Sequence, residues 1–119
     1  MLKFKKSKSP SVIFCKASGK ISEEDFNHGK EHIEKKIAKY KIIRVLIDVQ
    51  EVDFPDLNFF KEDLKFIIEH HSDIEKFAVI GDKAWERIWF TVMTTLFFLK
   101  AKFYHPHERK AAEEWILDE

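Results

Sequence analysis

The hydrophobic and polar positions of this chain follow two periods, and the change from one to the other divides it into strands and helices. Leu2 and Phe4 alternate with lysines, which predicts a short edge strand whose charges discourage aggregation. Apolar runs without alternation are typical of strands covered on both faces of a sheet. Such runs, and a short last strand, are predicted at residues 11–17, 42–47, 77–80 and 102–104.

Four segments with helical periodicity follow these strands. The first begins at Ser22, which we expect to cap the helix, with Asp25 at the capping-box position. The second follows a loop over residues 48–55, and Asp82 is expected to cap the third. Pro106 suits the first turn of the fourth. The elements therefore follow the order β-β-α-β-α-β-α-β-α.

This order predicts an α/β fold, because strand–helix alternation gives right-handed crossovers and a mostly parallel sheet covered by helices. The early hairpin adds an antiparallel strand, so we expect a mixed five-stranded sheet with four helices. The chain has 119 residues and contains no linker, repeat or low-complexity segment. Residues 1–119 are therefore expected to form a single domain.

Three segments of the chain resemble the SpoIIAA-like family of small bacterial proteins, which is related to the STAS domains of anti-anti-sigma factors. They are residues 45–48, residues 77–85, which include Trp85, and residues 103–116. The last two are similar to the family's strand-to-helix segment with its Trp and to its C-terminal helix. The resemblance covers nearly the whole chain and implies a STAS-like fold, although the family has no settled biochemical function.

The chain departs from the anti-sigma antagonists at the start of the second helix. Asp48, Val52, Phe54 and Asp56 match the spacing of their pattern, but residues 57–59 read Leu-Asn-Phe where the antagonists have a phosphorylatable Ser-Ser-Gly. We therefore expect a STAS-like module that lacks the phosphorylatable serine.

Net charge and hydropathy exclude several classes of partner. Twenty-one basic residues balance 21 acidic ones, so no global attraction to nucleic acid is expected, and self-association is easier. The longest apolar-rich run, residues 88–99, is shorter than the ~20 residues that span a bilayer, so no transmembrane segment is expected. No secretory signal is visible, and the single cysteine, Cys15, permits no internal disulfide. We expect a cytoplasmic protein.

Acidic residues gather in the loop after the third strand, where α/β folds usually bind ligands. They are Asp48, Glu51, Asp53 and Asp56. Turn and capping chemistry explains them without a site. A small hydrolase or isomerase built on this loop is the alternative, but no nucleophile can be paired with a base. We expect no catalytic residues.

The histidines give no metal motif. His28 and His32 share a helical face at i,i+4 spacing, but a third ligand is missing and a solvated polar face explains them. His70 and His71 end the second helix, where cations suit the helix dipole, and no partner for them is evident in the sequence. No metal or cofactor is expected.

The third helix carries more apolar surface than one buried face requires. Its main stripe is expected to be Trp85, Ile88, Trp89, Val92, Leu96 and Leu99. Phe90, Met93 and Phe97 form a second stripe, and Phe59 and Phe66 lie off the main stripe of the second helix. Neighbouring helices bury these residues, or the residues form a subunit interface or an apolar cleft.

Two hypotheses for function follow from these observations. The first is a non-enzymatic interaction or regulatory module that binds a protein partner or forms a homodimer. The alternative is a carrier or binder of an apolar small molecule or lipid. The five residues Phe59, Phe66, Phe90, Met93 and Phe97 are the candidate interface or ligand surface in both.

Overall fold

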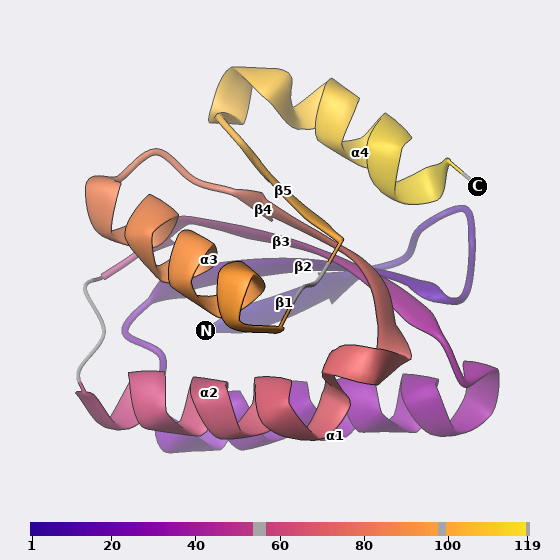
Figure 1. Ribbon diagram of the computed structural model, residues 1–119, viewed down its shortest axis with the longest axis horizontal. Helices are drawn as coiled ribbons and strands as arrows, with labels where there is room; N and C mark the ends of the chain where they lie inside the picture. The colour runs from indigo at the N-terminus through magenta and orange to yellow at the C-terminus, as the bar shows by residue number, and fades with distance from the viewer. Residues whose placement is uncertain (54–56, 98–99, 119) are drawn as a thin grey trace.

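The fold consists of one sheet with helices on both of its faces (Figure 1). The computed structural model describes residues 1–53, 57–97 and 100–118, and only the backbone of residues 57–60, 96 and 97. The strands are β1 (Leu2–Lys5), β2 (Val12–Gly19), β3 (Ile43–Val52), β4 (Ile74–Ile80) and β5 (Ala101–Tyr104). The helices are α1 (Glu23–Tyr40), α2 (Leu57–His70), α3 (Ala84–Phe97) and α4 (Arg109–Leu117), with 3₁₀ turns at His71–Asp73 and Pro106–Glu108.

The five strands follow one another in spatial order, β1-β2-β3-β4-β5. β1 pairs antiparallel with β2, placing Phe4 opposite Cys15, and the other three pairings are parallel. The predicted mixed five-stranded sheet with four helices is therefore confirmed.

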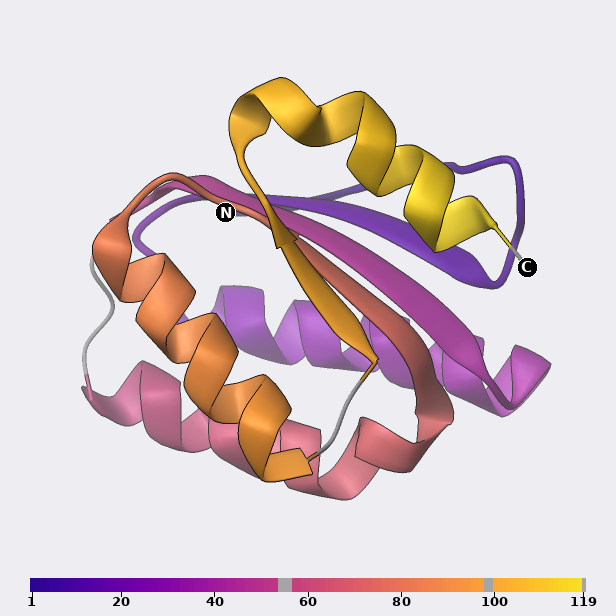
Figure 2. The same ribbon diagram turned by 45° about the horizontal axis from the view of Figure 1, so that its top comes forward.

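Helices α1, α2 and α3 lie on one face of the sheet, and α4 lies alone on the other (Figures 1 and 2). Right-handed crossovers between successive neighbouring strands bring the connecting helices to the same face. Each face has its own apolar core. On the three-helix face the central cluster of buried residues contains Ile13, Ala17, Ile43, Val45, Val49, Val52, Ile74, Phe77 and Val79. On the α4 face they are Val12, Leu46, Ala78, Ile80, Ala112 and Ile116.

The helix starts show which local sequence signals correctly predicted the N-terminus of a helix. Ser22 and Asp25 form the predicted capping box, with each side chain accepting a hydrogen bond from the other residue's backbone N–H. Pro106 occupies the first turn of the 3₁₀ segment that leads into α4. α3 begins at Ala84, and the carboxylate of Glu86, not that of Asp82, accepts hydrogen bonds from the free backbone N–H groups at its start.

The loop predicted over residues 48–55 begins later than expected. β3 continues to Val52 because Lys16, Ser18 and Gly19 of β2 pair with its second half. Asp48 and Glu51 therefore belong to a strand, where their side chains are fixed by the pleat and not by a turn.

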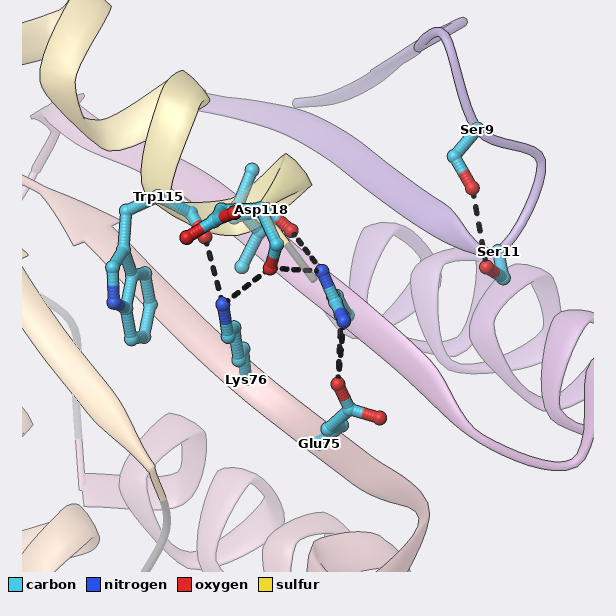
Figure 3. A network of polar contacts seen from close by, with 8 residues as sticks. Ser9, Ser11, Glu75, Lys76, Trp115 and Asp118 are labelled. Atoms are coloured by element: carbon cyan, nitrogen blue, oxygen red, sulfur yellow. Dashed lines mark hydrogen bonds and ion pairs between the residues drawn. The ribbon is translucent and has the colours of Figure 1, made fainter.

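Helix α4 is fastened to the sheet at its C-terminal end by two cations (Figure 3). Lys76 Nζ donates hydrogen bonds to the carbonyl oxygens of Trp115, at 3.0 Å, and Asp118, at 2.6 Å. Arg44 donates to the carbonyls of Ile116 and Asp118 and is paired with Glu75. These bonds satisfy carbonyl groups that the end of a helix leaves without partners.

The buried stripe of α3 differs from the predicted one. Ile88 and Val92 were expected to face the core, yet they are 64% and 48% exposed. Trp89 faces inward as predicted, but Phe90 and Met93 take the inward positions expected for Ile88 and Val92. The Phe90 ring lies 5.6 Å from that of Phe103 in β5. The inward position of the Glu86 carboxylate fixes this rotation, because it caps the helix from a fully buried position.

None of the helices in the described part of the chain is both long and apolar enough to cross a membrane.

Candidate functional site

A cavity of about 130 Å³ lies between the three-helix layer and the sheet. Its walls come from β1, β2, β3 and β4 and from all three helices on that face. Apart from Lys30 and Asp63, every residue of the described part of the chain that lines it is apolar or is glycine or cysteine. A lining of this composition repels water and suits an apolar occupant.

Aromatic rings form much of the wall contributed by the helices. Phe66 of α2 is 8% exposed, and its ring meets that of Phe26 of α1 edge-on at 6.4 Å. Trp89 of α3 meets Phe77 of β4 edge-on at 6.5 Å. Phe66 is the one candidate surface residue from the sequence that lies in the cavity wall among those whose side chains are described.

A polar pair joins two helices at this wall. The indole Nε1 of Trp89 donates a hydrogen bond of 2.6 Å to Oδ2 of Asp63 in α2. Burial raises the pKa of Asp63 to about 6, against the opposing effect of this hydrogen bond. Asp63 was not singled out in the sequence. The sequence does contain a feature that could have identified it. Asp63 lies four residues before Ile67, which places a carboxylate on the apolar face of α2.

Cys15 lies in the floor of the cavity, on β2. Burial raises the pKa of its thiol to about 12, and the positively charged N-terminus opposes this only in part. A thiol with such a pKa is almost entirely protonated at neutral pH and behaves as a small apolar group.

The other four candidate interface or ligand residues are Phe90 and Met93, whose side chains are described, and Phe59 and Phe97, whose side chains are not. Met93 is 7% exposed and Phe90 packs against the core of the three-helix face. The side chains of Phe59 and Phe97 lie outside the described part of the structure. Phe90 and Met93 thus face inward, whereas Ile88 and Val92 are the large apolar side chains that α3 exposes within the described residues.

The acidic residues after the third strand do not converge on one point. Asp48 is 1% exposed and is engaged by the guanidinium of Arg109 and by the side chain of Gln50, at 2.9 Å. Glu51 pairs with Lys16 at 2.6 Å on the surface, and Asp53 is exposed. Asp56 lies outside the described residues. Asp48 therefore anchors the start of α4 to β3.

Both histidines of the predicted pair on α1 pack against one aromatic ring. The ring of His32 stacks on Phe4 of β1 with centroids 3.9 Å apart, and His28 meets the same ring edge-on. Burial, followed by the neighbouring charges of Lys36 and His28, lowers the pKa of His32. Within the described residues this pair has no third metal ligand.

Taken with the sheet order, these features define a STAS-type α/β fold with a hollow beneath its three-helix face. The family model named SpoIIAA-like matches residues 12–117, and the chain belongs to this SpoIIAA-like family.

Two solved structures share the fold. An uncharacterised protein of the DUF3478 family with a SpoIIAA-like fold, from Shewanella loihica PV-4, has a TM-score of 0.74 and 24% identity, covering 98% of this chain and 92% of its own. The anti-sigma factor antagonist SpoIIAA in its unphosphorylated form has a TM-score of 0.61 and 9% identity, covering 99% of this chain and 100% of its own. At these identities the likeness concerns the fold alone. No functionally curated protein matches the chain.

Proposed function

We propose that this protein is a non-enzymatic binding module that holds a small apolar molecule in the cavity beneath α1, α2 and α3. The cavity itself carries the proposal, because its volume of about 130 Å³ is lined almost entirely by apolar groups. A dry apolar cavity of about 150 Å³ binds benzene or xenon in another protein. A ligand of one aromatic ring or a short branched alkyl group fits this size.

The polar groups at the wall define the chemistry of the ligand further. Among the described residues, Lys30 and Asp63 are the only ionisable side chains in the lining besides the protonated thiol of Cys15. Asp63 is engaged by Trp89 and its raised pKa disfavours the ionised form. A neutral ligand is therefore favoured over a charged one, because burial of an unpaired charge costs far more than apolar contacts return.

Two alanine-to-leucine substitutions, one inside the cavity and one outside it, test the proposal. Ala17 is 3% exposed and lines the cavity, whereas Ala111 is exposed on α4. Benzene should raise the melting temperature of the wild-type protein and of Ala111→Leu, because a ligand that binds only the folded state stabilises it. Ala17→Leu fills part of the cavity and should abolish that rise while circular dichroism stays unchanged. An equal benzene response in all three proteins, or in none of them, contradicts the proposal.

An interaction module is the second candidate, and the exposed pair Ile88 and Val92 favours it. The two side chains lie one turn apart on α3, and the chain has no net charge to oppose self-association. If this face joins two copies of the chain, Ile88→Glu should convert a dimer into a monomer in sedimentation without a change in melting temperature. A monomeric wild-type protein at high concentration contradicts this candidate.

A further inference from the structure

Three metal-ligating side chains meet where the C-terminal end of α2 lies against α1. His70 ends α2, and its Nε2 lies 3.0 Å from Oε2 of Glu34 in α1. Oε2 of Glu69 lies 3.7 Å from the same nitrogen. One ligand atom from each of the three residues lies within 4.8 Å of the other two. Figures 1 and 2 show α1 and α2 side by side along this contact.

We propose that Glu34, Glu69 and His70 form a binding site for a zinc-class divalent cation. Zinc binds imidazole nitrogen and carboxylate oxygen at about 2.0–2.2 Å, so neighbouring donors of a tetrahedral site lie about 3.3 Å apart. The two distances from Nε2 fall on either side of that value. The mixed nitrogen and oxygen donors favour zinc over magnesium or calcium, which prefer oxygen alone.

The other ring nitrogen of His70 supports this assignment. Nδ1 faces Oδ2 of Asp73 at 3.6 Å, on the side of the ring away from the two glutamates. A carboxylate behind a ligating histidine favours the tautomer that leaves Nε2 free for the metal. The ring of Phe66, with its centroid 4.8 Å away, packs against the imidazole and restricts its rotation. The ligand is thus oriented from two sides.

Charge and exposure at this position also suit a cation. The carboxylates of Glu34, Glu69 and Asp73 surround one imidazole, and the ammonium of Lys30 lies 3.9 Å from Oε2 of Glu69. One lysine ammonium leaves these three carboxylates short of positive charge. The side chains of His70, Glu34 and Glu69 are 15%, 41% and 50% exposed, so an ion reaches them from solvent without opening the fold.

Such an ion joins α1 to α2, and both helices line the cavity. Any effect of the ion on the exchange of an apolar ligand rests on the proposed function, whereas binding of the ion does not. Zinc binding is therefore measured on the full chain with no apolar ligand present.

Calorimetric titration with zinc chloride, together with thermal melts, tests the site. We expect one zinc ion per chain and a rise in melting temperature. Glu34→Gln and His70→Gln should each weaken binding by about tenfold or more, because each removes a donor from the metal. Glu31→Gln, on an exposed turn of the same helix, and the double variant His28→Gln/His32→Gln should bind as the wild type does.

Lys30→Met gives a test of opposite sign. Removing the ammonium beside Glu69 frees that carboxylate for the metal, so zinc should bind a few-fold more tightly in this variant. Weaker or unchanged binding in Lys30→Met removes Glu69 from the site and overturns the proposal. The proposal is also overturned if wild type binds no zinc, or if binding survives Glu34→Gln and His70→Gln and disappears with His28→Gln/His32→Gln.

Discussion

Trp89 and Asp63, 26 residues apart in the chain, are joined by a hydrogen bond of 2.6 Å that links α3 to α2 beside the cavity. The bond places a carboxylate where burial raises its pKa to about 6. The backbones of α2 and α3 lie next to each other, and this bond links their side chains across that contact.

Replacing Asp63 should change how stability depends on pH. The folded-state pKa of about 6 lies above the ordinary value of 3.8, so the folded state holds the proton more tightly than the unfolded one. Stability from this group is therefore greatest below pH 4 and is lost as pH rises through about 6. Asp63→Asn keeps an acceptor for Trp89 and cannot ionise, so it should exceed the wild type by about 1–3 kcal/mol at pH 7.

The measurement is denaturant unfolding of both proteins at pH 4.5 and pH 7. Glu62→Gln, one residue earlier in α2, controls for the loss of a negative charge. A stability difference between wild type and Asp63→Asn that is the same at both pH values contradicts the prediction.

Lys76→Met should loosen α4 alone. The substitution keeps most of the aliphatic stem but leaves the carbonyls of Trp115 and Asp118 without this donor, which costs about 1–3 kcal/mol. Amide hydrogen exchange should accelerate in α4 and remain slow in β2 and β3. Lys102→Met is the control, because Lys102 also lies over the Trp115 ring, at 5.1 Å, but donates no hydrogen bond to α4 within the described residues. Equal acceleration in the two variants would show that the ring contact, and not the hydrogen bonds, holds the helix.

Two glycine-to-alanine substitutions should have opposite signs. A Cβ at Gly81 would lie 2.8 Å from Oε1 of the fully buried Glu86 and 3.0 Å from the Phe103 ring, so Gly81→Ala should destabilise by about 1–3 kcal/mol. A Cβ at Gly29 meets only the flexible end of Leu2 at close range, at 2.6 Å, and alanine is the better helix former by about 1 kcal/mol. Gly29→Ala should therefore match or exceed the wild type in denaturant unfolding. If Gly29→Ala loses more than about 1 kcal/mol in the free energy of unfolding, the side chain of Leu2 in β1 cannot move aside for the new Cβ.

Cys15 should resist thiol reagents in the folded protein. Its pKa of about 12 leaves almost no thiolate at pH 8, and the side chain is buried. In the variant Ala111→Cys, the new exposed thiol should react with Ellman's reagent within seconds, while Cys15 reacts only when the protein unfolds. Two rapid phases of equal amplitude would show that the cavity floor opens readily to solvent.

The sequence predicted the order of elements because strand runs, a capping box and a proline at a helix start are local signals. The predicted rotation of α3 about its axis was wrong, because Ile88 and Val92 are exposed. By hydrophobicity alone, these two residues are as suitable for the buried face as Phe90 and Met93. What decides the rotation is a buried carboxylate, Glu86, a residue type that periodicity assigns to solvent.

The candidate sites depended on contacts between distant parts of the chain. Asp63 meets Trp89, and His70 meets Glu34 across 36 residues, so neither pair forms a motif. Asp48 was noticed in the sequence, but its partner Arg109 lies 61 residues away, and that pairing turns an apparent acidic cluster into an anchor for α4.

The strand order has a consequence for the origin of the hollow. Successive strands of a sheet are about 4.8 Å apart, whereas packed helices need 8–10 Å between their axes. Three helices that connect consecutive strands on one face therefore require about twice the width that their strands provide. The backbone of α1 lies close to β1 and β3 and that of α3 lies close to β5, whereas α2 lies close to α3. In this chain the mismatch in width is consistent with the space beneath the three helices, which either large side chains or a separate molecule can fill.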